Sequence, residues 1–382
     1  MWLLFFFQYA AIGVFSIFIN LYFHDEGLSG TQIGVLNMVA ALVSVGGSVL
    51  WGYLSDRSGK PRLLIAIGAL GAMAAAQFVP YASEFGTFLL ITVVANLLGS
   101  APATLTDSTV LVLLGARRED YGRFRLGGSF GYIIAGTASG FIFQQLGLRI
   151  MFPTYGVIMT GFAVVALLLP PVKVRLESSG KKEILRMIGQ PAWLLFIISL
   201  FLSYIAITSS ITFLSVSLGA MGASQSLIGI ASTIATIAEI PFMFFSGSFL
   251  RRFGPTRLLI VGLALTVLRF FLLGWMPSPG WAVAINVLNG PGFVFVWNSA
   301  INYANRMAPQ GMAGTAQGLL VSTMNLAGVV SSLLSGWLFD LLGPTGLFVV
   351  MGFVVLAALI LFSSGYLMHR PGVGVKAASR SE

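Results

Sequence analysis

Four ionisable side chains stand inside long apolar runs and are the first candidates for chemistry. They are Asp107, Arg125, Glu239 and Arg269, which place one acid and one base in each half of the chain. A charge inside an apolar run is costly, so such residues in membrane proteins usually face a partner, a substrate or an ion. Position 116 lies midway between Asp107 and Arg125, and position 254 midway between Glu239 and Arg269. If each midpoint is a turn between antiparallel helices, each acid lies level with its base.

These residue types suit ligand binding and proton transfer. Arg125 can hold a carboxylate, a phosphate or a hydroxyl group through paired N–H groups, and Asp107 can accept hydrogen bonds from substrate hydroxyls. Burial favours the protonated form of a carboxyl group, and a neighbouring arginine favours its charged form. Glu239 beside Arg269 is therefore the best proton carrier, with Asp107 as the second. The alternative is a structural role, in which two salt bridges hold helices together.

The elements that position these residues are membrane-spanning helices. The chain is 57% apolar and only 9% charged, whereas a soluble domain is about 25% charged. Its apolar blocks have the length of about 20 residues that crosses a bilayer, and in lipid a helix satisfies every backbone group internally. We therefore expect an all-α polytopic membrane protein with twelve transmembrane helices, at 2–23, 32–54, 63–81, 87–114, 122–144, 151–170, 191–218, 225–250, 257–276, 281–306, 313–339 and 345–367.

The basic residues predict the orientation of the chain. They gather in alternate loops, in the segment 171–190 and in the tail 369–382, whereas the opposite loops carry Asp25, Glu26, Glu84 and Asp340, with Arg149 as their lone base. By the positive-inside rule, both termini are cytoplasmic. This distribution explains the net charge of +9 without a nucleic-acid partner. We expect the plasma (inner) membrane of a prokaryote, and an N-terminal six-helix half at 1–170, a linker at 171–190, a C-terminal six-helix half at 191–368 and a cytoplasmic tail at 369–382.

A repeated glycine pattern divides each half again. Two glycines seven residues apart close an apolar run at Gly52/Gly59, Gly140/Gly147, Gly247/Gly254 and Gly336/Gly343. The first and third pairs end spans on the inside, and the other two end spans on the outside. Chance is the alternative, because the chain has 45 glycines. Three-helix units in opposite orientation, doubled, are one plan of secondary transporters, so we expect 3+3 inverted repeats.

The first of these turns resembles the hallmark loop of the major facilitator superfamily. Gly52-x-x-x-Asp56-Arg57-x-Gly59-Lys60-x-Arg62 matches that loop between spans two and three, and the second copy carries Arg251 where the first has Asp56. The resemblance covers nearly the whole chain and implies a cytoplasmic gate; a solvated basic turn that only sets topology is the alternative. The expected gate residues are Gly52, Asp56, Arg57, Gly59, Lys60, Arg62, Arg251, Arg252, Gly254 and Arg257.

A second stretch is similar to the lactose-permease and phenylpropionate-permease branch. In that branch an acid on span four faces an arginine on span five, followed by a small residue and an aromatic one. Asp107, Arg125, Ser129 and Tyr132 occupy these positions, and the resemblance implies that they bind substrate. It also implies a coupling role for Glu239 and Arg269. Where the branch has a histidine on span ten this chain has Asn289, and Gly292 stands where the lactose permease has a carboxylate.

Further polar and aromatic groups lie on span ten. Asn289-Gly-Pro-Gly292 interrupts this span, and Gly99-Ser-Ala-Pro102 interrupts span four at a matching place. Glycine and proline free backbone groups that can line a cavity, although a simple kink or close packing would use the same residues. We expect Asn289, Trp297 and Asn298 to contribute to substrate binding.

The sequence thus predicts a secondary active transporter that works by alternating access, most simply a proton-coupled symporter of a sugar, nucleoside or aromatic acid. A proton-coupled exporter of amphipathic compounds is the alternative, and a non-transporting receptor or lipid scramblase is a third class. The chain has no Walker loop, HExxH motif or nucleophile elbow, so we expect no enzyme activity. It has no cysteine, and we expect no cofactor and no metal site. The expected partners are a small-molecule substrate, protons and the bilayer, with the chain acting as a monomer.

Overall fold

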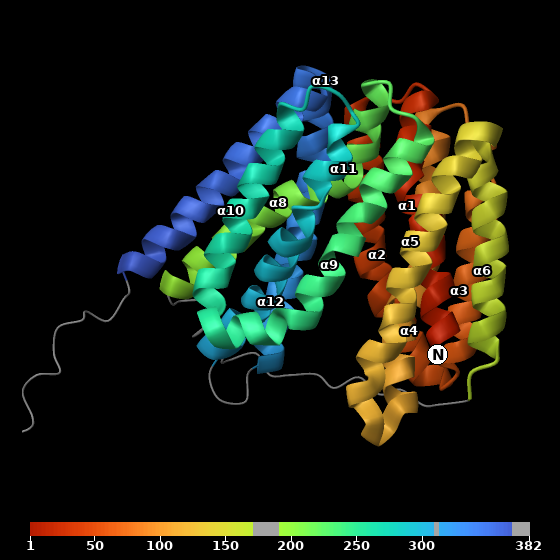
Figure 1. Cartoon of the computed structure of the whole chain (residues 1–382). Helices are drawn as coiled ribbons and strands as arrows, with labels where there is room; N and C mark the ends of the chain where they lie inside the picture. Colours follow the sequence, from red (N-terminus) through yellow and green to blue (C-terminus); the bar gives the residue numbers. More distant parts are fainter. Residues whose placement is uncertain (171–190, 309–312, 369–382) are drawn as a thin grey trace, which may run out of the picture.

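The chain folds into long helices packed side by side (Figure 1). The computed structural model describes residues 1–170, 191–308 and 313–368. Within these ranges, ten helices are long and apolar enough to cross a membrane, and no residue is in a β-strand. The all-α membrane class predicted from the sequence is therefore confirmed. The predicted linker at 171–190 and tail at 369–382 lie outside the described residues.

Helices α1 to α6 form the first group. Helix α2 begins with a capping box, in which Ser29 Oγ accepts from the Gln32 amide and Gln32 Oε1 accepts from the Ser29 amide. It ends at Gly59, whose φ of 63° is the left-handed conformation that glycine adopts without strain. The helices are α1 Trp2–Asp25, α2 Gly30–Ser58, α3 Pro61–Ala76, α4 Phe85–Leu114, α5 Tyr121–Leu146 and α6 Met151–Leu167.

The second group departs from the predicted spans in two places. The span expected at 281–306 is divided into α11 (Trp281–Asn286) and α12 (Asn289–Met307). The two spans expected at 313–339 and 345–367 form the continuous element α13 (Ala313–Met368), with a non-helical break at Gly343, which has a φ of 67°. The remaining helices match their predicted spans within a few residues: α8 Pro191–Ala220, α9 Gln225–Phe253 and α10 Pro255–Gly274.

The two groups meet chiefly where α2 packs against α13, α5 against α9, and α1 against α8. Glycines allow the closest approaches. A Cβ atom added to Gly30 would lie 2.7 Å from the carbonyl oxygen of Gly336, and one added to Gly140 would lie 2.7 Å from that of Gln225. Backbones that touch in this way need residues without side chains. These approaches join the start of α2 to α13 and the end of α5 to the start of α9, so they lie at one end of the bundle.

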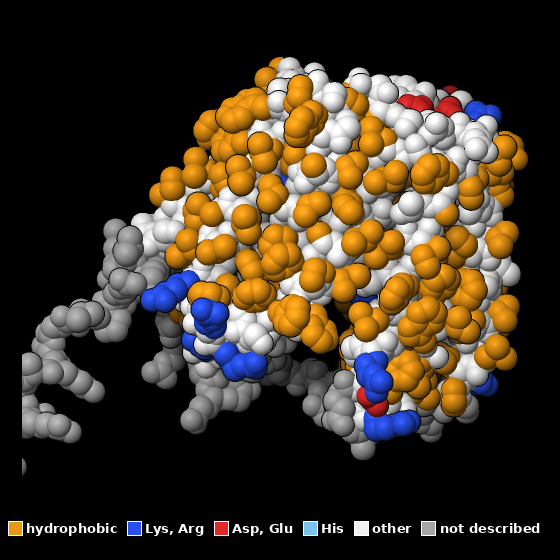
Figure 2. Space-filling view, in the orientation of Figure 1, with side chains coloured by type: hydrophobic (Ala, Val, Ile, Leu, Met, Phe, Trp, Pro, Cys, Tyr) orange, Lys and Arg blue, Asp and Glu red, His pale blue; other side chains and the backbone are white. Residues whose placement is uncertain are grey.

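That end also carries Glu26 and Asp340, and we call it the acidic end. Asp340 accepts hydrogen bonds from the Gly30 amide at 2.6 Å, the Thr31 amide at 2.7 Å and the Thr31 hydroxyl at 2.6 Å. The opposite end, the basic end, carries Arg57, Arg123 and Arg251. Figure 2 shows Lys and Arg side chains at the bottom of the view, acids at the top, and a hollow between the two groups at the bottom.

Candidate functional site

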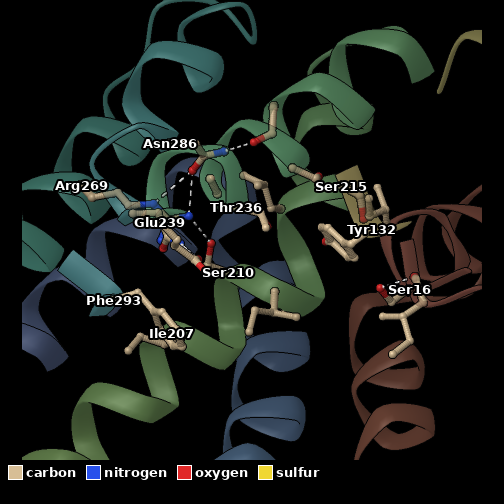
Figure 3. Close-up of a pocket in the computed structure, with 18 residues that line it drawn as sticks. Ser16, Tyr132, Ile207, Ser210, Ser215, Thr236, Glu239, Arg269, Asn286 and Phe293 are labelled. Atoms are coloured by element: carbon tan, nitrogen blue, oxygen red, sulfur yellow. Dashed lines mark hydrogen bonds between the residues drawn. The ribbon is translucent and has the colours of Figure 1, made fainter. Parts of the chain in front are cut away.

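A cavity of about 300 Å³ lies between the two groups of helices and holds four of the predicted site residues. Tyr132 comes from α5, Glu239 from α9, Arg269 from α10 and Asn289 from the start of α12. Figure 3 shows Arg269, Glu239 and Asn286 gathered at one side of the cavity, with Tyr132 and Ser16 across from them. One cavity thus combines side chains from both groups of helices.

Arg269 is the central cation of this cavity. Its side chain is only 4% exposed. Its Nε donates to Asn286 Oδ1 at 3.1 Å, and its Nη2 donates to the same oxygen at 2.8 Å and to Ser210 Oγ at 2.8 Å. Asn286 in turn donates to the Ala231 carbonyl at 2.9 Å. These bonds connect α10, α11, α9 and α8, and they hold the guanidinium group in one orientation.

Glu239 has a neutral partner of its own. Its Oε1 accepts a hydrogen bond from Asn289 Nδ2 at 3.1 Å. Helix α12 can begin this close to α9 because Gly290 contacts the backbone of Ala238, where a Cβ atom would clash. The break between α11 and α12 therefore places Asn286 on Arg269 and Asn289 on Glu239. The Asn289 position, predicted from the interruption of span ten, lies in the cavity.

The acid and the base of this pair do not contact each other directly. Among the described residues, the carboxylate–guanidinium pairs within 4.0 Å are Arg123 with Asp120 and Arg149 with Glu26, both at the ends of the bundle. Glu239 and Arg269 share the cavity without an ion pair in this conformation. The salt bridge of the structural alternative is absent from this pair, and two asparagines each hold one partner.

Asp107 and Arg125 form a second cluster, in which the acid and the base again each bind a neutral residue. Asp107 accepts a hydrogen bond from the Tyr121 hydroxyl at 3.0 Å. Arg125 donates to the Tyr9 hydroxyl, and its guanidinium carbon lies 4.0 Å from the centre of the Tyr9 ring. These two residues are not among those that line the cavity of Arg269. Of the four positions drawn from the resemblance, only Tyr132 reaches that cavity.

A second cavity of about 460 Å³ lies between α2, α8, α12 and α13. Trp297, a predicted substrate residue, lines it together with Ser44, Thr208 and Asn325. The Trp297 ring stacks on that of Phe293, with 6.0 Å between their centres, and Phe293 lines the first cavity. This aromatic pair therefore stands between the two cavities.

The remaining predicted residues make local contacts. Ser129 lies on α5 and lines neither of these two cavities, and Asn298 donates to the Met243 sulfur at 3.4 Å. In the gate loop, Asp56 is exposed, and Arg62 donates to the Leu169 carbonyl at 3.0 Å within the first group. Other gate side chains also stay close to their own helix: Arg57 reaches Tyr53, Arg251 reaches Ser248, and Arg252 lies over Phe253.

Sequence reasoning missed Asn286 and Ser210. Both are polar residues inside apolar spans, and both are buried in the structure. The signal for Asn286 was its spacing, since it stands three residues before Asn289 and would share its side of an unbroken helix. It also missed Tyr9, the partner of Arg125, since nothing in the sequence links span one to span five.

Comparison with known proteins places these features in a family. The model of the MFS_1 like family matches residues 1–368. The maltose permease of Geobacillus stearothermophilus is 25% identical over 342 residues, covering 88% of this chain and 86% of the relative. A probable 3-phenylpropionic acid transporter of Escherichia coli (strain K12) is 25% identical and covers 94% of each chain.

Solved structures share the fold. The crystal structure of the nucleoside transporter NupG superposes with a TM-score of 0.75 at 16% identity, covering 96% of this chain and 98% of the other. A POT family transporter in complex with a thioalcohol-conjugated peptide superposes with a TM-score of 0.73 at 14% identity, covering 96% of this chain and 95% of the other. At such identities the likeness concerns the fold alone.

Proposed function

The chain belongs to the MFS_1 like family, and on this premise we propose that it is a proton-coupled symporter of a small polar or aromatic solute. It is an integral membrane protein, with ten helices long and apolar enough to cross a bilayer. We place it in the plasma membrane of a prokaryote with both termini inside. The chain then has twelve spans, with the break at Gly343 as the last outer turn, in two six-helix halves built from 3+3 inverted repeats.

The observation that carries the proposal is the cavity shared by Glu239 and Arg269. A carboxyl and a guanidinium group line one space between the two groups of helices, yet each is held by a neutral asparagine. Transporter sites lie near the midplane, between repeats that rock about them. In this conformation the halves touch at the acidic end and part at the basic end (Figure 2). This arrangement supports exchange of solute with the side that the basic residues face.

The separation of the acid from the base supports the proposal of proton coupling. A buried carboxyl group with only a neutral partner favours its protonated form, and an approaching arginine favours the ionised form. Movement of Arg269 toward Glu239 during closure would therefore release the proton. Asp107 and Arg125, which also have neutral partners, are the corresponding groups of the first half.

The proposal is tested by uptake into proteoliposomes that contain a pH-sensitive dye. With an imposed inward proton gradient, we expect the wild type to accumulate a transported acid, sugar or nucleoside. Glu239→Gln should keep counterflow exchange but lose accumulation, because it cannot release a proton. Accumulation that survives in this variant would refute the proton role of Glu239, and transport without any dye response would refute symport.

Export of amphipathic compounds is the second candidate. It is favoured by the stacked Phe293 and Trp297 between the two cavities. Drug sensitivity of cells with and without the gene distinguishes the two: an exporter lowers sensitivity when it is overexpressed, and an uptake symporter does not.

A further inference from the structure

One edge of the Arg269 guanidinium group has no hydrogen-bond partner in the part of the chain that the structure describes. A guanidinium group carries five N–H donors. Nε and Nη2 donate to Asn286 and Ser210, whereas no bond from Nη1 is made to the described residues. The side chain is 4% exposed and lines the cavity. The cavity therefore contains a buried cation with free donors.

This cation has no carboxylate in direct ion-pair contact among the described residues. Glu239, the carboxyl group that lines the same cavity, accepts from Asn289 and lies outside the 4.0 Å range of an ion pair. A buried charge without a partner is costly. Asn286 and Asn289 keep the two groups apart, so the vacant partner position of Arg269 is open to a ligand.

We propose that the free Nη1 edge of Arg269 binds the carboxylate group of a monocarboxylic acid with an apolar body. A carboxylate supplies both the acceptor oxygens and the negative charge that the guanidinium group requires. A neutral sugar or nucleoside would supply acceptors but leave the charge uncompensated. A phosphate dianion would carry one negative charge more than the guanidinium group compensates.

The remaining walls of the cavity suit an apolar body. Ile207, Ile211 and Leu214 of α8, Phe293 of α12 and Tyr132 of α5 provide apolar surface. The hydroxyl groups of Ser16, Ser215, Ser232 and Thr236 line the cavity beside them. Ring-bearing or branched aliphatic chains gain from contact with such walls. A cavity of about 300 Å³ lies at the small end of the usual range for ligand sites, so the acid should be small.

This assignment names a substrate class for the proposed function and rests on that function for its role in transport. Ligand binding to the purified protein tests the assignment separately. Purified protein in detergent is titrated with phenylacetate, 3-phenylpropionate and 4-phenylbutyrate, each beside its primary amide, while thermal unfolding is followed. The amide has nearly the shape of the acid but no charge. We expect at least one acid to raise the unfolding temperature of the wild type, and its amide to bind about 10- to 100-fold more weakly.

Three variants assign the effect to the residue. Arg269→Gln should lose the response to the acid, whereas Arg123→Gln, which removes an exposed arginine, should keep it. Glu239→Gln should bind the acid at least as tightly as the wild type, because it removes the competing carboxylate. The assignment is overturned if acid and amide stabilise equally, if Arg269→Gln keeps the response, or if no acid of the series shifts the folded wild type. Acid binding without proton movement in vesicles would sink the symport proposal and leave this assignment standing.

Discussion

At the residue scale, Asn286 and Asn289 determine which groups the buried side chains of Arg269 and Glu239 contact. Asn286 holds Arg269 with two hydrogen bonds, and Asn289 holds Glu239 with one. An amide group can both donate and accept, so each asparagine satisfies its partner without adding charge. Charged residues in these positions would fix the protonation state of the site, whereas amides leave it free to change.

Asn286 can be tested by two substitutions with opposite effects on stability. Asn286→Ala removes two of the three bonds of Arg269 and the bond from Asn286 to the Ala231 carbonyl. It should lower stability by about 1–3 kcal/mol. Asn286→Asp should supply Arg269 with a counter-charge, and so keep or raise the unfolding temperature.

Both variants should weaken acid binding, since the first frees Arg269 to approach Glu239 and the second occupies it. Thermal unfolding with and without the best-binding acid measures both effects together. A purely structural role for Asn286 would be indicated if Asn286→Asp bound the acid as tightly as the wild type.

At the element scale, the start of α2 and the middle of α13 form a closure at the acidic end. Gly336 permits the contact with Gly30, and Asp340, four residues later, accepts from two amides at the start of α2. The same spacing separates Gly52 from Asp56. The gate motif at the end of α2 thus has a counterpart on α13. The repeated glycine pairs Gly52/Gly59 and Gly336/Gly343 relate the two segments in the sequence. In the described part of the chain Asp56 has no hydrogen-bonded partner, whereas Asp340 accepts three hydrogen bonds from Gly30 and Thr31.

We predict that Asp340→Asn loosens the closure at the acidic end. A carboxylate at a helix N-terminus accepts amide hydrogens and complements the helix dipole. Asp340 is exposed, so the effect should be modest, with the balance between conformations shifting by about 2- to 5-fold. Asp56→Asn should change the balance between conformations little, because Asp56 accepts no hydrogen bond from the described residues in this conformation.

The shift is measured by double electron–electron resonance between spin labels placed on α2 and α13 at the acidic end. Asp340→Asn should broaden the distance distribution toward longer values, and Asp56→Asn is the matched control. Identical distributions for wild type and Asp340→Asn would show that Asp340 does not hold the closure.

At the scale of the whole molecule, the sequence was sufficient for the class of fold and for most of the helices. Apolar length and the bounding glycines located the spans because both reflect local physics. The interruption of span ten was visible as Asn289-Gly-Pro-Gly292. The sequence did not predict that the break places Asn286 on Arg269 and Asn289 on Glu239. Whether Asp107 contacts Arg125 depends on Tyr9, which arrives from span one, and whether Glu239 contacts Arg269 depends on Asn286. Such partners are set by how helices rotate against each other, which spacing along the chain does not encode.

The whole molecule should alternate between two arrangements of its halves, and the natural absence of cysteine makes this measurable. Asn325 is exposed on α13 and lines the second cavity. A single Asn325→Cys should react readily with a membrane-impermeant thiol reagent from the side that the basic end faces. Ligand-driven closure should slow this reaction several-fold, because the cavity walls then meet.

Val157→Cys is the control for this experiment. Val157 is 74% exposed on α6 and lines neither of the two cavities described, so its reactivity should not respond to ligand. Faster labelling of Asn325→Cys in wild-type background than in Asp340→Asn would link the closure at the acidic end to the opening at the basic end. The ligand used is one that raises the unfolding temperature. If Asn325→Cys is labelled equally with and without this ligand, binding does not close the second cavity. Alternating access would then have to involve other parts of the interface between the halves.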